Sequence, residues 1–502
     1  MDHKRLSRRD FLRWSAVAAG TTALAACGPT TPPATEKPLE ATPVPPTEKV
    51  EATAAPTEAA EPTVAPTEKV EATAPAQEAQ IRFAMWDWYA YAPGIRWDEW
   101  NQNEAFPVFQ ADNPGITLTW EPLGDGWESK VLTQMAAGTA PDIMSVWSPI
   151  LETWAEKGQL LNLQPLIDLD IPNADQLYIK AAWDQMWEPF TGTRMGMLAD
   201  LDITSVYYSK PAFEEAGVPL PTVDWTVDDY TAAAQKLTKK DDSGNITRWG
   251  GELRPDFWLG YFYYVEAFGG QVRDEETRMT CLLDQPDAQA GLEWIRKGMW
   301  ELNCLAQSNQ MNATGVPNLW TGALPAGIVA FAERSADQFF ALSDSMAEGS
   351  WDIAHIPQGP KGRACMGVPD EWVVYKGVVE RGNQEAVWKV MKWLAGDWYQ
   401  EKIASAAGRI PGLLSAVGKW ADTLRNLDAR LKAVRLEVLQ EQIQMGYARR
   451  GPIFRFQQAA QELVNPALEA IYVEGKEQVS IFKDIAPKVT KAQQEALARA
   501  GG

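Results

Sequence analysis

Short apolar strands and amphipathic helices alternate over residues 79–166, and this alternation limits the possible folds more than any other feature of the chain. Residues 81–85 and 116–120 have the apolar, strand-like composition of buried β-structure. The segment between them carries Trp97, Trp100 and Phe106 and is predicted to be a helix. Strands that alternate with helices predict an α/β fold in which helices flank a sheet.

Residues 129–147 form the clearest helix–turn–strand unit of this region. An amphipathic helix is predicted to end at Gly138, where a helix C-cap glycine would stand. The apolar residues 143–146 then form a short strand, with Asp142 fixing the turn before it and Trp147 after it. Ligands of open α/β sheets bind beyond the carboxyl ends of strands. We therefore expect Trp147 at the mouth of a cleft.

Residues 1–27 are predicted to be an export signal and not part of the fold. Arg8 and Arg9 belong to an S-R-R-x-F-L pattern, which is a twin-arginine signature, and a weakly apolar run follows. The run ends in the residues LAAC at Cys27, which resemble a bacterial lipobox, whose cysteine is acylated and becomes the mature N-terminus. The alternative is an ordinary signal peptide with a chance cysteine. We expect an extracytoplasmic, lipid-anchored protein at the cell surface or in the periplasm.

Residues 28–78 have low complexity and cannot form a hydrophobic core. They are rich in proline, contain no aromatic residue, and repeat the sequence PTEKVEATA at 46–54 and 66–74. Such a composition predicts a disordered stalk with polyproline II character. The stalk would tether a globular part that begins at about residue 79.

Charge and histidine content exclude several classes of function. The chain has 67 acidic and 46 basic residues, a net charge of −21, which argues against a nucleic-acid partner. The only two histidines are His3, in the signal, and His355, in a predicted strand. Zinc sites rich in histidine are thus excluded, and a catalytic triad would have to use His355, which we interpret as structural. No metal or other cofactor is predicted.

Three cysteines, Cys281, Cys304 and Cys365, lie in the globular part. An odd number in an exported protein leaves two alternatives open. Cys281 and Cys304 could form a disulfide, or all three could be buried thiols.

Five short motifs follow one another in a fixed order along the globular part. They are MAAGTAPDI (135–143), VYYSK (206–210) with FEEAGVP (213–219), WT (225–226) with DD (228–229), FGG (268–270) and GRIP (408–411). In this order and spacing, the chain resembles the family 1 extracellular solute-binding proteins of ABC importers. This is the sugar-type group similar to maltose-binding protein.

The resemblance implies a two-lobed, type II periplasmic-binding-protein fold with a ligand cleft between the lobes. It places lobe I at residues 79–200 and 357–407, lobe II at 201–356 and 408–502, and hinge crossings near 199–203, 356–358 and 407–409. Bound ligand would then shift an equilibrium between open and closed lobes.

Tryptophan content supports a carbohydrate ligand independently of the resemblance. The chain has 23 tryptophans, 22 of them beyond the stalk. Sugars present apolar C–H faces and hydroxyl rims, which suit aromatic faces flanked by carboxylates and arginine. The candidates at predicted strand ends and adjacent loops are Trp86, Trp88, Trp147, Trp258 and Trp372, with Asp202, Glu333, Arg334, Glu371 and Arg409 as polar partners. Asp202 also matches a family position, next to the first hinge, that often carries a sugar-binding carboxylate.

The sequence thus predicts a monomeric, non-catalytic receptor that captures a mono- or oligosaccharide and delivers it to an ABC permease. An acidic, aromatic cleft could instead hold a polyamine or another small cation. Ferric iron bound by Tyr207 and Tyr208 is disfavoured because successive strand residues point to opposite faces. An extracellular glycoside hydrolase would need two suitably spaced carboxyl groups, and no motif that would carry such an acid is evident.

Overall fold

The structure is a computed structural model, and it describes residues 78–86, 96–124, 126–147, 150–254, 260–316 and 319–500. The predicted signal, the stalk and the lipidation residue Cys27 lie outside the described residues, as do Trp88 and Trp258. Residues 73–502 form one compact unit. Within the described part, no helix is both long and apolar enough to span a bilayer.

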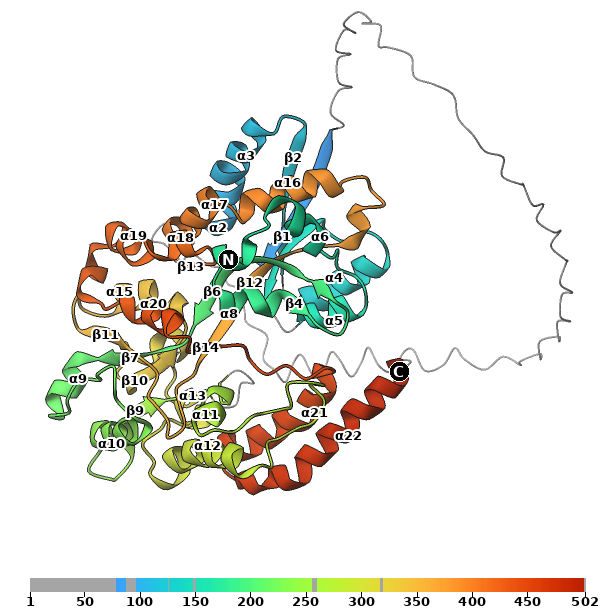
Figure 1. Cartoon of the computed structure of the whole chain (residues 1–502). Coiled ribbons are helices and arrows are strands. Elements are labelled where there is room, and N and C mark those ends of the chain that lie inside the picture. Colours follow the sequence, from blue (N-terminus) through green and yellow to red (C-terminus); the bar gives the residue numbers. More distant parts are fainter. Residues whose placement is uncertain are drawn as a thin grey trace, which may run out of the picture. The chain divides into compact units, whose positions relative to one another are not determined.

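The strands that begin the first sheet alternate with helices along the chain, as predicted (Figure 1). Its strand order is β13-β6-β12-β3-β1-β2, with β14 paired to β12. The strands are β1 (Ala79–Trp86), β2 (Ile116–Leu123), β3 (Ile143–Trp147), β6 (Gly196–Ile203), β12 (Cys365–Val374), β13 (Ile410–Pro411) and β14 (Ala448–Arg449). β1 pairs in parallel with β2 and β3, whereas β12 runs antiparallel to β3 and β6. The intervening helices are α2 (Trp97–Trp100), α3 (Phe106–Asp112) and α4 (Trp127–Ala136).

The connection from α4 to β3 follows the predicted helix–turn–strand geometry. Gly138 has a φ of 73°, its N–H donates to the Met135 carbonyl at 3.2 Å, and the Thr139 N–H donates to the Gln134 carbonyl at 2.8 Å. These two bonds are those of a Schellman cap, which requires the left-handed conformation that glycine tolerates. The buried Asp142 carboxylate accepts bonds from the Arg82 N–H at 2.9 Å and from Arg381 at 2.7 Å, so Asp142 fixes the start of β3.

The second sheet has the strand order β11-β7-β10-β9-β8. Its strands are β7 (Ser205–Ser209), β8 (Lys239–Lys240), β9 (Ile246–Glu252), β10 (Val329–Arg334) and β11 (Trp351–Ala354). Helices α9 (Lys210–Glu215), α10 (Val227–Leu237), α11 (Phe262–Ala267) and α12 (Pro286–Arg296) alternate with these strands along the chain. The predicted α/β fold is therefore confirmed, with these two large sheets and a two-stranded pair of β4 (Trp187–Glu188) and β5 (Thr193–Arg194).

The chain crosses between the sheets at Thr204 and again between β11 and β12. Gln358 and Lys361 donate their N–H groups to the carbonyls of Trp225 and Ala267, each at 3.0 Å, and the predicted crossing at 356–358 stays a prediction. The fully buried Gln442 of α20 (Glu437–Gln444) links Thr204 to the segment that follows β11. It donates to the Thr204 carbonyl at 3.1 Å and accepts the Ile356 N–H at 3.0 Å. The exact limits of the two lobes stay a prediction.

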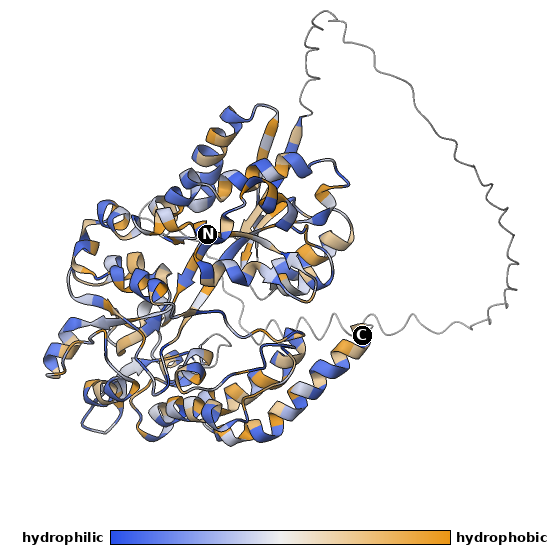
Figure 2. Ribbon diagram, viewed as in Figure 1, coloured by the Kyte–Doolittle hydropathy of each residue, from blue (hydrophilic) through white to orange (hydrophobic). Residues whose placement is uncertain are grey.

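The C-terminal helices α21 (Gln457–Leu468) and α22 (Phe482–Ala500) pack side by side (Figure 1). Hydrophilic and hydrophobic residues alternate along α22 in Figure 2. Its buried residues Phe482, Ala486, Val489 and Gln493 recur at helical spacing, so one stripe of the helix faces the protein.

The three described cysteines are free, buried thiols, so the Cys281–Cys304 disulfide alternative is wrong. Burial raises the pKa of the Cys281 thiol to about 12 and that of Cys304 to about 11. Both thiols are therefore protonated and unreactive at neutral pH.

Candidate functional site

A cavity of about 250 Å³ lies between residues that come from both sheets. The first sheet and its extensions contribute Trp147, Asp202, Met366, Val368, Asp370 and Arg409. The second sheet and its connections contribute Arg254, Gly260, Tyr263, Trp320, Glu333 and Ser335, and Thr204 lies at the crossing. Four of the predicted ligand residues, Trp147, Asp202, Glu333 and Arg409, thus line one cavity, although contact with a ligand stays a prediction.

Arg409 lies at the centre of a cluster of aspartates on the first-sheet side of the cavity. Asp200 of β6 and Asp370 of β12 are register partners, and Asp202 lies two residues further along β6 on the same face. The Arg409 guanidinium donates to Asp200 Oδ1 at 2.9 Å and to Asp370 Oδ2 at 2.5 Å. Its Nη1 lies 3.9 Å from Asp202 Oδ2.

Three carboxylates around one guanidinium cannot all be neutralised by it, which favours the protonated form of one of them. Burial and the neighbouring Asp200 carboxylate raise the pKa of Asp370 well above its ordinary value, although Arg409 opposes this shift. The shift favours the protonated form of Asp370, and in that form the carboxyl group can donate a hydrogen bond as well as accept one.

Asp202 also connects the two sides of the cavity. Its Oδ1 accepts a hydrogen bond from the N–H of Ala336 at 2.9 Å. Ala336 lies two residues after the end of β10. A strand of the first sheet is thereby tied to a connection of the second.

Glu333 is the acidic group on the second-sheet side. It is 3% exposed and accepts hydrogen bonds from the hydroxyl groups of Tyr263 and Tyr264 on α11. Burial raises the pKa of Glu333 to about 7, although the tyrosine hydroxyls oppose the shift. Near neutral pH this carboxyl group is therefore divided between its two protonation states.

The raised pKa of Glu333 predicts a pH dependence of stability. Its pKa is about 7 in the folded protein and 4.5 in the reference state, so between these values the folded state holds a proton that the unfolded state has released. The free energy of unfolding should therefore fall as pH rises from about 4.5 to 7, by at most about 3 kcal/mol from this group. Urea unfolding at pH 5, 6, 7 and 8 measures the slope.

Glu333→Gln should flatten that slope, because glutamine does not titrate. Glu266→Gln is the matched control, since burial also raises the pKa of Glu266 to about 7 but its side chain lies outside this cavity. Each variant should remove the part of the pH dependence of the unfolding free energy that comes from the carboxyl group it replaces. An unchanged slope in Glu333→Gln would contradict the assignment.

Three predicted residues do not line the cavity. Glu371 follows Asp370 in β12, points to the opposite face of the sheet and is fully buried. Trp372 is 1% exposed and packs edge-on against Tyr399, with ring centroids 5.5 Å apart. Arg334 is 2% exposed and forms an ion pair with the buried Glu252. The contribution of β12 thus comes from Met366, Val368 and Asp370, and not from Glu371 or Trp372.

The remaining predicted tryptophans cannot be placed in the cavity. Trp86 ends β1, but its side chain lies outside the described part, as do Trp88 and Trp258. Trp258 falls between Arg254 and Gly260, both of which line the cavity.

Sequence reasoning missed Asp370, Trp320, Tyr263 and Arg254. Asp370 had a usable signal, because Met366, Val368 and Asp370 alternate along one strand and face the cavity together. Trp320 stands in the glycine- and proline-containing stretch 315–322, where a large aromatic residue has little local reason to be buried. No local pattern distinguishes Tyr263 or Arg254.

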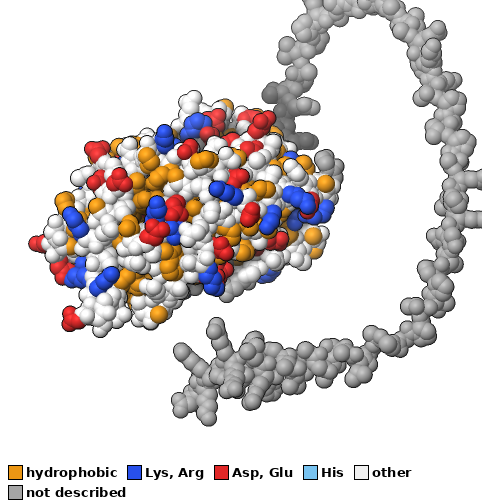
Figure 3. Space-filling view, turned by 90° about the horizontal axis from the view of Figure 1, so that it is seen from below, with side chains coloured by type: hydrophobic (Ala, Val, Ile, Leu, Met, Phe, Trp, Pro, Cys, Tyr) orange, Lys and Arg blue, Asp and Glu red, His pale blue; other side chains and the backbone are white. Residues whose placement is uncertain are grey.

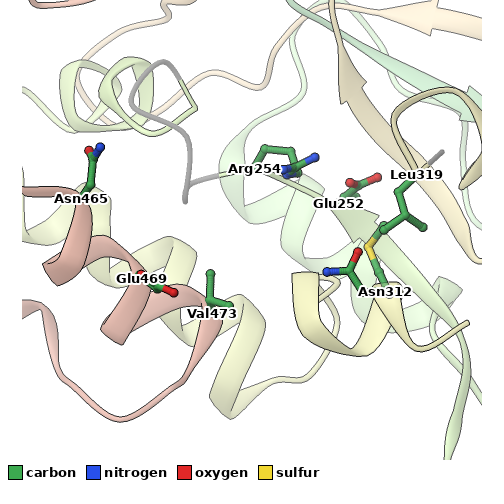
Figure 4. A pocket seen from close by; sticks show the side chains of 8 residues that line it. Glu252, Arg254, Asn312, Leu319, Asn465, Glu469 and Val473 are labelled. Carbon is green, nitrogen blue, oxygen red and sulfur yellow. The ribbon is translucent and has the colours of Figure 1, made fainter. Parts of the chain in front are cut away.

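Two further cavities adjoin the central one through shared residues. A cavity of about 390 Å³ shares Trp147 and is lined by Gln457, Gln458 and Gln461 of α21, opposite Glu128 and Lys157. Another of about 320 Å³ shares Arg254. Figure 4 shows Asn465, Glu469 and Val473 on one side of this hollow, with Arg254, Glu252, Asn312 and Leu319 on the other. The polar lining therefore continues beyond the central cavity in both directions.

Charges on the outer surface are mixed. Acidic and basic side chains are interspersed with hydrophobic ones on the face shown in Figure 3. That face does not present the continuous basic surface that binding to nucleic-acid phosphates requires.

Comparisons with known proteins agree with this architecture. The model of the family described as bacterial extracellular solute-binding protein matches residues 96–401, and a twin-arginine translocation pathway signal sequence matches residues 5–25. A protein of Brucella abortus (strain 2308), described provisionally as a binding protein, is 23% identical over 394 residues, which cover 77% of this chain and 88% of the relative.

Two solved structures share the fold at low sequence identity. The ABC substrate-binding protein of Listeria monocytogenes in complex with cycloalternan has a TM-score of 0.67 and 20% identity, covering 84% of this chain and all of that chain. The sugar-binding protein MalE of Xanthomonas citri has a TM-score of 0.66 and 16% identity, covering 84% of this chain and 98% of that chain.

Proposed function

Because the chain belongs to the bacterial extracellular solute-binding protein family, we propose that it is the receptor of an ABC importer and captures a carbohydrate in the cleft between its sheets. The twin-arginine signal and the family together indicate export from the cytoplasm. The carbohydrate ligand, its delivery to a permease and the absence of catalysis are our proposals.

One observation carries the carbohydrate assignment. Trp147 is the last residue of β3 in the first sheet, and Trp320 lies in the connection that leads to β10 of the second sheet. Both line the same cavity, beside Asp202, Asp370 and Arg409. Indole faces suit the apolar C–H faces of a sugar ring, and the carboxyl and guanidinium groups suit its hydroxyl rim. A ligand between the two tryptophans would touch both sheets at once.

The adjoining cavities favour a ligand longer than one sugar unit. The central cavity of about 250 Å³ shares Trp147 with one neighbour and Arg254 with the other. Amide side chains in both neighbours, such as Gln458 and Asn465, can donate to and accept from hydroxyl groups. The cycloalternan complex of the Listeria relative is consistent with an oligosaccharide.

Transport would use closure of the two lobes around the ligand. Contacts from both sheets stabilise the closed arrangement more than the open one, so bound sugar shifts the population toward closure. The permease would then recognise the closed form. The Asp202–Ala336 bond is one contact that already links the two sides.

A ligand panel tests the proposal. Isothermal titration and tryptophan fluorescence should show saturable binding of at least one of glucose, galactose, mannose, maltose, maltotriose and mannotriose, with the oligosaccharides binding more tightly. Sugar analysis after prolonged incubation should return the ligand intact, because the protein is proposed to be non-catalytic.

Two results would overturn the assignment. Binding of spermidine or an amino acid with no response to any saccharide would favour a cationic or other small solute. Shortened oligosaccharide products would indicate a glycoside hydrolase.

We also propose that Cys27 is acylated and that residues 28–78 space the receptor from the membrane. The lipobox-like residues that end at Cys27 support this. Incorporation of labelled palmitate into the wild-type chain and not into Cys27→Ser would test it, and equal labelling of the two would exclude Cys27 as the acylated residue.

A further inference from the structure

Arg334 holds both the backbone and the ring of Trp320. Its Nε donates to the Trp320 carbonyl at 2.7 Å, and its Nη2 donates to the Leu319 carbonyl at 3.3 Å. Its guanidinium carbon lies 4.8 Å from the centroid of the Trp320 ring. One side chain thus fixes a peptide segment and the indole that the segment carries.

Arg334 is itself held firmly. It ends β10, is 2% exposed and forms an ion pair with Glu252, which ends the neighbouring strand β9 and is 1% exposed. Its Nη1 donates to the Glu333 carbonyl at 2.7 Å. A planar guanidinium can make these bonds and stack on an aromatic ring at the same time, which an ammonium group cannot do.

Trp320 needs such support because its own element is short. It lies in α14 (Leu319–Gly322), a helix of four residues. One helical turn has little stability of its own, so its position depends on tertiary contacts. Trp320 also lines the cavity, whereas Arg334 does not.

We propose that Arg334 is a positioning residue that orders the Trp320 indole as a stacking face for the carbohydrate, with Glu252 orienting Arg334. This inference rests on the proposed function. Arg334 does not touch the ligand and acts through Trp320. Ordering the ring before the ligand arrives lowers the entropic cost of binding, which is how preorganisation raises affinity.

A double-mutant cycle tests whether Arg334 acts through Trp320. Purified exported protein is titrated with maltotriose, or with the panel saccharide that binds more tightly. Arg334→Lys should weaken binding about tenfold, because lysine keeps the charge for Glu252 but loses the stacked plane and its fork of donors. In a Trp320→Ala background, Arg334→Lys should weaken binding less than twofold further.

A second variant separates positioning from stability. Arg334→Met with Glu252→Gln removes the buried charge pair together, so neither charge is left unpaired. It should fold cooperatively and still lose about tenfold in affinity. Arg296→Met is the matched control: Arg296 is also buried in the second-sheet half and pairs with Glu293 and Glu301, but it lies outside the three cavities of the cleft. Its affinity should match the wild type.

A readout without ligand keeps this inference separate from the proposed function. In protein labelled with 5-fluorotryptophan, the ¹⁹F resonance of Trp320 is identified by its absence in Trp320→Phe. Arg334→Lys should shift or broaden that resonance, and Arg296→Met should not. If the resonance responds and no saccharide binds, the proposed function fails while the positioning role stands.

Three results would overturn the inference. They are an unchanged Trp320 resonance in Arg334→Lys, an unchanged affinity in both Arg334 variants, and fully additive losses in the cycle. Additive losses would mean that Arg334 affects the ligand independently of Trp320.

Discussion

Arg409→Met is expected to lower the free energy of unfolding by about 3–5 kcal/mol, the largest stability effect that the site predicts. Arg409 is 6% exposed and is the cation that Asp200 and Asp370 share. Methionine keeps much of the side-chain volume but leaves the buried cluster without its cation and the oxygens of Asp200 and Asp370 without these hydrogen-bond donors. A loss of this size is a large fraction of the stability of an ordinary domain. Urea unfolding at pH 7 measures it.

Two comparisons sharpen that experiment. Asp370→Asn should cost less stability than Arg409→Met, because the fold already disfavours the charge that asparagine lacks. Arg425→Met should cost less than about 1 kcal/mol, because Arg425 pairs with the half-exposed Glu437, whose charge solvent can still reach. If Arg409→Met were as mild as Arg425→Met, the cluster would not have the proposed electrostatic role.

The protonation of Asp370 can be tested by the same method. Its pKa is raised well above 3.8 in the folded protein, so the folded state keeps a proton that the unfolded state loses. The stability of the wild type should therefore decrease as pH rises above about 4 and toward the folded pKa. Asp370→Asn should lack this part of the decrease. An identical pH profile in both proteins would show that Asp370 is ionised in the fold.

Trp147→Ala and Trp320→Ala are each expected to weaken saccharide binding by about 2 kcal/mol, or roughly 30-fold. Each substitution removes one aromatic side chain from the cavity lining and leaves the other in place. Isothermal titration with the best panel ligand measures the change. The effects should be similar in size if the sugar ring is held between the two indoles.

Trp398→Ala is the control for a general loss of tryptophan. Trp398 of α17 (Asp397–Lys402) is 37% exposed and stacks against Trp100 and Trp393, away from the cavity. Its affinity should equal that of the wild type. Wild-type affinity in both Trp147→Ala and Trp320→Ala would remove the central argument for a carbohydrate.

Much of the architecture could be predicted because local signals and the tertiary fold agree. Gly138 marks a helix end in the sequence and makes the Schellman cap in the structure. Asp142 was expected to fix the turn before β3, and its two hydrogen bonds do so. Patterns of this kind depend on a few neighbouring residues, so a single sequence is enough to read them.

The site was harder to predict because it depends on which residues of each strand point toward the cavity. Glu333 and Arg334 are adjacent in β10, yet only Glu333 lines the cavity. In β12 the sequence favoured Glu371 and Trp372. Alternation turns Glu371 away from the face of Asp370, and Trp372, although on that face, packs against Tyr399. Composition identifies such pairs of residues, and only the pairing with neighbouring strands decides which member faces the cavity.

The burial of the Cys281, Cys304 and Cys365 thiols bears on whether the protein folds before or after its export. A chain that folded only after reaching an oxidising exterior would expose the three cysteines of its globular part while still unfolded, and these could then mispair or cross-link molecules. A chain that folds in the reducing cytoplasm hides all three beforehand. The fold is therefore suited to being completed before secretion, with the interior itself protecting the sulfur atoms.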